Sequence, residues 1–390
     1  MSAHAARIER AFVDETLIRE AFEPVDRLAA ELQDAPHPED SGAELVRLAR
    51  RLGEAGVLRL VVPARDGGVF PELSSRALCL ARERLGHALP LAELAFAMQG
   101  LGSYPIVHAG SEALRKQWLP DVVAGRAIAA FALTEPDAGS DLGGLSTHAR
   151  RDGDHYVLDG HKVFISNAGV ASFYSLFAVT DAHAPKKKLS AFVVPADADG
   201  LRVVPQHVLG GHPIGELRLH GVRVPVASRL GEEGEGMGIA LATLARFRPT
   251  VGAAALGFAQ RALDEAVHHV RTRKQFGAAL AEQPQVQAML ADSACELDAA
   301  RLLVYRAAAC ADAGGTRAEL ARAGSMAKLV ATENAQRVID RAVQLHGGRG
   351  VLQSSVVARL YEEVRALRIY EGATEVQKIL VARALLGAAP

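Results

Sequence analysis

The sequence contains few cysteines, few aromatic residues and almost no net charge. Cys79, Cys295 and Cys310 are the three cysteines among 390 residues, and no two of them form a CxxC pair. A disulfide framework is therefore excluded, and the free thiols predict a cytoplasmic location. The 44 Lys and Arg residues balance the 45 Asp and Glu residues, which leaves a formal net charge of -1. This balance argues against a nucleic-acid-binding or membrane-surface protein.

Several familiar signals are also missing. No apolar run approaches the ~18 residues of a membrane helix, and the first twenty residues carry acids and lack the apolar core of a signal peptide. The 14 histidines show no HExxH or Cys/His spacing, so we expect no metal site. There is no GxGxxG, GxxxxGK[ST] or GxSxG motif. The sequence therefore predicts neither a common dinucleotide-binding fold nor a serine hydrolase.

The sequence does show three successive types of periodicity. Apolar residues make up 49% and charged residues 23%, as is typical of a folded chain. The apolar spacing is helical in residues 1–127, changes to β-rich runs in residues 128–235, and becomes helical again in residues 236–390. We predict an α+β protein with an N-terminal helical domain, a middle domain of antiparallel sheet or barrel, and a C-terminal helical bundle.

The middle part is predicted to be antiparallel because its strands follow one another without intervening helices. Two Asp-Gly pairs, Asp152-Gly153 and Asp159-Gly160, are hairpin signals within it. We therefore expect a turn at each pair.

Four segments combine residue types that suit a polar ligand. Thr134, Ser140 and the backbone N–H groups around them suit a polar ring edge and a phosphate. Each segment alone has an ordinary explanation, as a turn, a strand end or a helix C-cap. The segments are FALTEPDAGSD (131–141), VFISNAG (163–169), RTRKQFG (271–277) and QLHGGRG (344–350).

Taken together, these motifs resemble those of the acyl-CoA dehydrogenase flavoenzymes. TEPxxGSD, RxxFG, QxxGGxG and IYEG occur in this order, and the resemblance covers nearly the whole chain. It implies an N-terminal helical domain, a middle β-domain and a C-terminal four-helix bundle. It also implies FAD bound without the Rossmann fingerprint, which accounts for the missing GxGxxG.

The resemblance assigns a set of residues to FAD. Thr134 is expected near the pyrimidine edge and N5 of the flavin, and Phe164 and Ser166 stand where the family usually has Trp and Thr. In the family, the segments of Arg273 and Gln344 reach a neighbouring subunit's cofactor, so we expect a homotetramer built as a dimer of dimers. The expected cofactor-binding residues are Phe131, Leu133, Thr134, Gly139, Ser140, Phe164, Ser166, Arg273, Phe276, Gln344, Gly347, Gly348, Ala373 and Glu375.

The resemblance also implies the reaction. Glu371 of IYEG matches the catalytic base, which removes the α-proton of an acyl-CoA thioester while the β-hydride leaves to flavin N5, giving a 2-enoyl-CoA. Arg248 matches an arginine near the base and the thioester end of the substrate, and Ser140, Arg248 and Gly372 are expected to contact the substrate. A carboxylate in a dry pocket has a raised pKa and is a better base. An electron-transferring flavoprotein is the expected electron acceptor.

Some departures from the family pattern leave alternatives open. The family often has an acidic residue at the position of Ala245, where it contacts the pantetheine. An acyl-carrier-protein-bound substrate therefore remains an alternative to an acyl-CoA. A flavin monooxygenase of the same fold is a further alternative, although it needs no α-proton acceptor. A catalytically silent binding protein is the alternative outside the enzymes.

Overall fold

The computed structural model describes residues 14–33, 40–184 and 188–387. The chain forms two compact units. The helical unit comprises Met1–Ala35, Ser74–Glu93 and Ala245–Pro390, and the sheet unit comprises Pro36–Leu73 and Leu94–Leu244. Of the first twenty residues, from which no signal peptide was expected, residues 1–13 lie outside the described residues.

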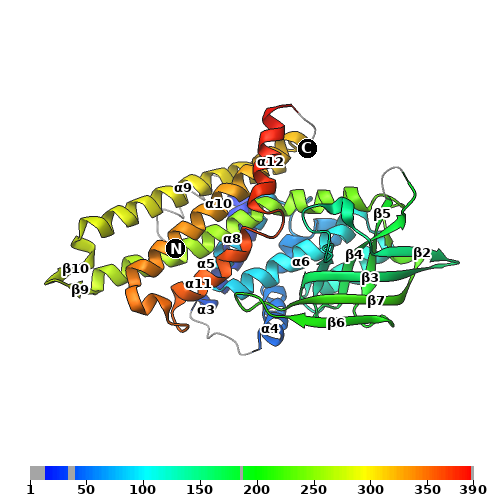
Figure 1. The fold of residues 1–390 in the computed structure, drawn as a ribbon, viewed down its shortest axis with the longest axis horizontal. Helices are drawn as coiled ribbons and strands as arrows, with labels where there is room; N and C mark the ends of the chain where they lie inside the picture. Colours follow the sequence, from blue (N-terminus) through cyan, green and yellow to red (C-terminus); the bar gives the residue numbers. More distant parts are fainter. Residues whose placement is uncertain (1–13, 34–39, 185–187, 388–390) are drawn as a thin grey trace. The chain divides into compact units, whose positions relative to one another are not determined.

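Long helices form the helical unit (Figure 1). Its core is an apolar stripe in which Leu256, Val304, Val338 and Val364 are buried. Helical spacing places such residues on one face of each helix, so the faces bury one another. The principal helices are α3 (Glu23–Leu32), α5 (Ser75–Ala88), α8 (Gly236–Thr272, which begins in the sheet unit), α9 (Pro284–Asp312), α10 (Arg317–His346), α11 (Val356–Leu367) and α12 (Thr374–Leu385).

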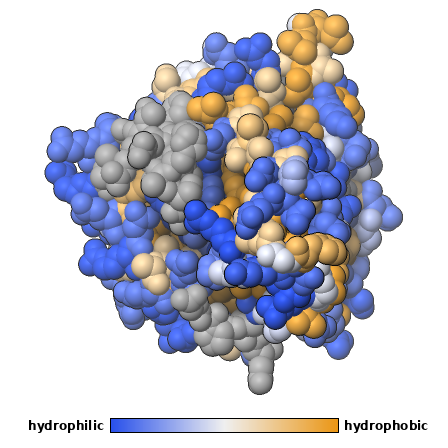
Figure 2. Space-filling model, turned by 90° about the vertical axis from the view of Figure 1, so that its left-hand side faces the viewer, coloured by the Kyte–Doolittle hydropathy of each residue, from blue (hydrophilic) through white to orange (hydrophobic). Residues whose placement is uncertain are grey.

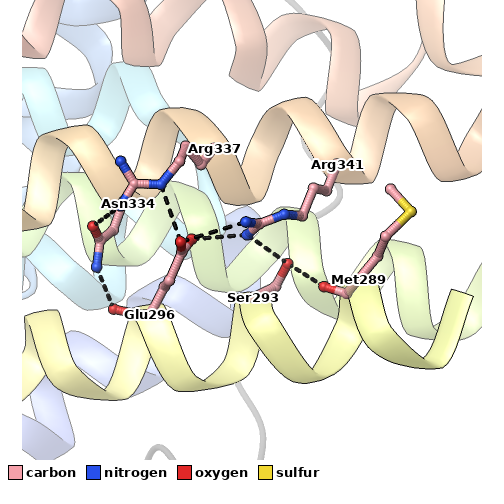
Figure 3. Close-up of polar contacts among 6 residues, drawn as sticks. All are labelled: Met289, Ser293, Glu296, Asn334, Arg337 and Arg341. Carbon is pink, nitrogen blue, oxygen red and sulfur yellow. Dashed lines mark hydrogen bonds and ion pairs between the residues drawn. The ribbon is translucent and has the colours of Figure 1, made fainter. Parts of the chain in front are cut away.

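The two helices α9 and α10 lie side by side and are joined by a polar network (Figures 1 and 3). Glu296 of α9 accepts hydrogen bonds from Arg337 Nε at 3.0 Å and Arg341 Nη1 at 2.7 Å, both from α10. These hydrogen bonds lower the pKa of Glu296, although burial opposes them. The network joins α9 to α10 alongside the buried apolar residues of both helices.

The sheet unit contains an eight-stranded sheet with the order β6-β7-β3-β2-β4-β5-β8, and β1 joins it on β4. Helices α4 (Ser41–Glu54), α6 (Pro90–Ala109, which begins in the helical unit) and α7 (Glu112–Val123) complete this unit. The strands are β1 (Ala129–Ala132), β2 (His148–Asp152), β3 (His155–Ser166), β4 (Phe173–Asp181), β5 (Lys188–Pro195), β6 (Leu201–Gln206), β7 (Ile214–Pro225) and β8 (Arg229–Leu230).

The sheet is mainly antiparallel, as predicted, but β1 and β2 both pair with β4 in parallel. The turn predicted at Asp152-Gly153 joins β2 to β3. The turn predicted at Asp159-Gly160 is wrong, because β3 continues through this pair with a register shift against β7. A Cβ at Gly160 would lie 2.7 Å from Thr147 Cα. Gly160 therefore allows two backbone segments to approach closely at an irregularity in the strand. It does not reverse the direction of the chain.

The predicted order of helices, sheet and helices is confirmed. The division at residues 127 and 235 stays a prediction, because the compact units are assembled from segments that are separated in the sequence. Among the described residues, no helix is long and apolar enough to cross a membrane.

Candidate active site

Glu371 lies in the tight turn between α11 and α12 of the helical unit. Its φ is +51° and that of Gly372 is +96°, so two successive residues are left-handed. Lys328 Nζ and Gln377 Nε2 both donate to the Gly372 carbonyl, at 2.7 and 2.8 Å. A left-handed non-glycine residue is strained and persists only where its surroundings hold it. The two donors provide part of that hold.

A second set of contacts holds the same turn. Thr374 N donates to the Arg368 carbonyl at 3.0 Å, which closes the loop around Glu371. Glu333 of α10 accepts from Arg368 Nε at 2.8 Å and from Thr374 Oγ1 at 2.6 Å. The backbone at Glu371 is therefore fixed from both sides of the loop.

One oxygen of the Glu371 carboxylate is shielded from solvent and has no hydrogen-bond partner in the described part of the chain. This oxygen, Oε2, is inaccessible to solvent and accepts no hydrogen bond from the described residues. Burial raises the pKa of Glu371, while the positive charges of Arg82, Lys328 and Arg248 act in the opposite direction. The Glu371 N–H also donates to no acceptor within the described ranges. One turn thus presents a proton acceptor and a free backbone donor.

Two cations of the unit face this carboxylate. Burial lowers the pKa of Lys328 to about 8, although Glu371 favours its charged form. Burial also lowers the pKa of Arg248, again opposed by Glu371. The Arg248 Nε is buried and has no partner among the described residues. Arg248 therefore lies beside Glu371 as expected, whereas the sequence analysis did not identify Lys328.

A buried ion pair, also missed by the sequence analysis, completes this group. Arg82 of α5 pairs with Glu93 at the start of α6 and donates to Thr250 Oγ1 at 2.7 Å. Burial and the negative charge of Glu93 raise the pKa of nearby Glu363 to about 7. The signal that could have revealed the pair is a charged residue within the apolar helix LCLARERLG, where burial requires a partner.

Three residues expected to contact substrate or cofactor follow shortly after Glu371 in the chain. Gly372 forms the second half of the left-handed turn, and its carbonyl is already engaged. Ala373 precedes α12, and Glu375 is exposed in the first turn of that helix.

In the sheet unit, the expected flavin residues Leu133 and Thr134 follow β1. The Thr134 carbonyl accepts from Val163 N at 3.0 Å, which places this turn beside the end of β3. Within the described residues, neither the Thr134 N–H nor its hydroxyl bonds to protein. These two donors are available to a ring edge. Phe131 packs behind them, with its ring 5.0 Å from that of Phe177.

The glycine-rich end of the same segment leaves its backbone donors free. Gly139 and Ser140 are exposed, and neither N–H bonds to an acceptor within the described ranges. The Ala138 N–H instead bonds back to the Glu135 carbonyl at 3.2 Å and closes the preceding turn. Free N–H groups of this kind suit a phosphate. The segment therefore fits both the ring edge and the phosphate of FAD.

Phe164 and Ser166 lie at the end of β3, next to the Thr134 turn. Phe164 has a φ of +56° and its side chain is 60% exposed. Its N–H donates to Gln206 Oε1 at 3.1 Å, which holds this conformation. An exposed aromatic ring in a strained conformation is costly without a ligand. This observation fits a flat ring stacked on Phe164, with Ser166 half-buried beside it.

The remaining expected residues gather where α8 and α10 end. Phe276 is 95% exposed, and Gln344, Gly347 and Gly348 are exposed at the end of α10. The two helix ends meet where the rings of His269 and His346 stack at 4.4 Å. Burial lowers the pKa of His269, and the neighbouring His346, Arg349 and Arg273 lower it further. This end is therefore cationic and suits an anionic ligand.

The two groups of the helical unit are separate. Lys328, which holds the Glu371 turn, and Gln344 are sixteen residues apart on α10, or about 24 Å at 1.5 Å per residue. Within this unit Glu371 and the cationic helix end therefore do not form one pocket.

Three family models together match almost the whole chain. They describe the acyl-CoA dehydrogenase N-terminal domain at residues 11–126, the middle domain at residues 130–222 and the C-terminal domain at residues 234–386.

Individual relatives are similar over nearly their full length. Cyclohexane-1-carbonyl-CoA dehydrogenase of Geobacter metallireducens is 39% identical over 338 residues, which are 86% of this chain and 88% of that protein. Butyryl-CoA dehydrogenase of Megasphaera elsdenii is 31% identical with a TM-score of 0.81, covering 90% of this chain and 100% of that chain. A glutaryl-CoA dehydrogenase from Mycobacterium smegmatis in complex with FADH2 is 27% identical with a TM-score of 0.86, covering 98% and 97%. The chain belongs to the acyl-CoA dehydrogenase family of FAD-dependent oxidoreductases.

Proposed function

We propose that this protein catalyses the FAD-dependent α,β-dehydrogenation of an acyl-CoA thioester, with Glu371 as the base that removes the α-proton. The observation that carries the proposal is the environment of Glu371. Its Oε2 is inaccessible to solvent and has no partner among the described residues, and burial raises the pKa of the carboxyl group. A structural carboxylate would instead have its hydrogen bonds satisfied.

The chain's own residues account for the proton transfer. Burial favours the neutral carboxylic acid, so Glu371 gains stability as it accepts a proton. Arg82, Lys328 and Arg248 limit this effect and keep the carboxylate available before the reaction. The free Glu371 N–H can donate to the thioester carbonyl as negative charge develops on it. FAD supplies the acceptor for the hydride that leaves the β-carbon.

We propose further that Thr134, Ser140, Phe164 and Ser166 hold FAD in the sheet unit, with Phe131, Leu133 and Gly139 shaping the same segment. The free donors of Thr134 and the exposed ring of Phe164 support this assignment.

The physiological acceptor is proposed to be an electron-transferring flavoprotein. A relative from Acetobacterium woodii, 34% identical over 352 residues, is named as a subunit of a caffeyl-CoA reductase-Etf complex. Reoxidation of the substrate-reduced enzyme by a purified electron-transferring flavoprotein tests this partner.

A panel of substrates tests which acyl group and which carrier the enzyme accepts. The relatives named above suggest cyclohexane-1-carbonyl-CoA, butyryl-CoA and glutaryl-CoA as its members. Each is added anaerobically to the enzyme, and loss of the flavin absorbance is followed. The best acyl group is then compared on CoA and on an acyl carrier protein, because Ala245 leaves the usual acidic position empty.

Glu371→Gln tests the base directly. The amide keeps the shape of the side chain but cannot accept the α-proton, so anaerobic flavin reduction should slow by ~10²–10⁴-fold. FAD content and acyl-CoA binding should be unchanged. Glu362→Gln, which changes an exposed carboxylate on α11, is the matched control and should reduce its flavin normally.

Other results distinguish the alternatives. Wild-type flavin reduction by Glu371→Gln would place the base elsewhere. Oxygen-dependent product hydroxylation without anaerobic reduction would indicate a monooxygenase. A protein that binds the panel without any reduction would be catalytically silent.

A further inference from the structure

A fully buried ion pair lies directly behind the Thr134 turn. Lys162 of β3 donates from Nζ to Glu135 Oε1 at 2.8 Å and to the Leu133 carbonyl at 3.0 Å. Lys162 is 0% exposed and Glu135 is 4% exposed. One ammonium thus binds the residues on either side of Thr134.

Glu135 connects this ammonium to the start of β2. Its Oε2 accepts from Ser146 N at 2.7 Å and from Ser146 Oγ at 2.8 Å, and its Oε1 also accepts from Thr147 N at 3.0 Å. Burial alone would raise the pKa of Glu135, but Lys162 and these donors hold it at about 2. The carboxylate is therefore satisfied and ionised.

The contacts leave the outer side of the turn free for a ligand. Lys162 engages the Leu133 carbonyl, and Val163 N engages the Thr134 carbonyl. The Thr134 N–H and hydroxyl have no acceptor among the described residues. The acceptors of the turn are thus used by the protein, while its donors remain available.

We propose that Lys162 is a positioning residue for FAD, whose ion pair with Glu135 holds the Leu133–Glu135 backbone so that the Thr134 donors meet the cofactor. The proposal rests on the proposed placement of FAD at Thr134, and it assigns no contact between Lys162 and FAD. Stability alone does not require this arrangement, because a buried ion pair is often replaceable by neutral side chains at little cost.

A double-variant experiment separates positioning from folding. Lys162→Met and Glu135→Gln should each lower the melting temperature of the protein, because each leaves one buried charge without its partner. The double variant Lys162→Met/Glu135→Gln should regain most of that loss. The dissociation constant of the double variant for FAD should nevertheless be raised about tenfold or more. If the Thr134 N–H and hydroxyl are displaced, FAD loses roughly one to two hydrogen bonds.

The readout is FAD released from the diluted holoenzyme, measured by its fluorescence. Arg223→Met is the matched control, because it removes an exposed ion pair with Asp152 in the same sheet and should leave FAD release unchanged. The proposal is supported if the double variant regains its melting temperature but still releases FAD more readily than the wild type. Recovery of FAD affinity together with stability overturns it, as does a wild-type protein that binds no FAD. Wild-type FAD binding without acyl-CoA oxidation would instead refute only the proposed reaction.

The wild-type protein provides a second measurement. Burial lowers the pKa of Lys162 to about 8, although Glu135 favours the charged form. FAD release should therefore increase as the pH rises through about 8, and the double variant should lack this dependence. Equal pH dependence in both proteins would contradict the role of the ammonium.

Discussion

At the scale of single residues, backbone strain coincides with the proposed chemistry. Phe164, Asn167, Phe276 and Glu371 are the non-glycine residues with positive φ among those described. Three of them were expected to contact FAD or substrate from sequence motifs alone, and Asn167 is buried at the end of β3, where its Nδ2 donates to the Ala129 carbonyl at 2.9 Å. Strained conformations of this kind cluster at ligand sites because the surrounding structure must hold them.

Arg248 is predicted to tune the base. Arg248→Met removes a positive charge beside Glu371, so the pKa of Glu371 should rise further. Flavin reduction by the best acyl-CoA should slow about tenfold or more at neutral pH. The rising limb of the pH profile of this rate should move to higher pH. FAD content should not change. Stopped-flow absorbance over a series of pH values measures both effects.

The control for Arg248 is Arg306→Met, an exposed arginine on α9. It should leave the rate and its pH profile unaltered. If Arg248→Met behaves like this control, Arg248 does not act on the base.

At the scale of elements, the close approach of α5 and α8 depends on a glycine. A Cβ at Gly257 would collide with the Glu83 carbonyl oxygen and lie 2.8 Å from His87 N, and both are backbone atoms of α5. Gly257→Ala should therefore destabilise the protein by roughly 1–3 kcal/mol, as overpacking a core does. Urea denaturation measures the change in the free energy of unfolding.

Gly238→Ala is the comparison within the same helix. A Cβ there meets nothing within 4 Å, so the change should be neutral or stabilising by roughly 0.5–1 kcal/mol. Equal destabilisation by both substitutions would rule out close packing as the cause.

At the scale of the whole molecule, stability should depend on the protonation of Glu363. Its pKa of about 7 lies above the ordinary value of 4.5, because of burial and the charge of Glu93. The neutral acid is therefore favoured in the folded state, and this contribution is complete below pH 4.5 and lost as the pH rises through 7. Glu363→Gln should gain stability over the wild type across this window, by roughly 1–3 kcal/mol above pH 7. Thermal melts from about pH 4 to about pH 8 test this, because this range covers both the ordinary and the raised pKa.

Assembly is the second whole-molecule prediction. Several large apolar side chains are exposed in the helical unit, including Phe276 at 95% and Leu386 at 83%, and Figure 2 shows hydrophobic residues at the surface among hydrophilic ones. We propose a homotetramer in which the cationic end near Arg273 binds a neighbouring subunit's FAD. Arg273→Ala should weaken FAD binding and assembly together, as measured by light scattering and flavin release. A wild-type monomer that retains full FAD would contradict this proposal.

The sequence by itself determined the order of helices, sheet and helices and the positions of the motif residues. These depend on local periodicity and on residues close together in the chain, such as Glu371 and Gly372. The tertiary structure decided which distant charges gather around them. Lys328 reaches the Gly372 carbonyl across 44 residues, and Lys162 reaches Glu135 across 27. It also decided that β1 and β4 are parallel and that Asp159-Gly160 continues a strand. Periodicity records which face of an element is buried, but not which partner covers it, so these contacts required the folded chain.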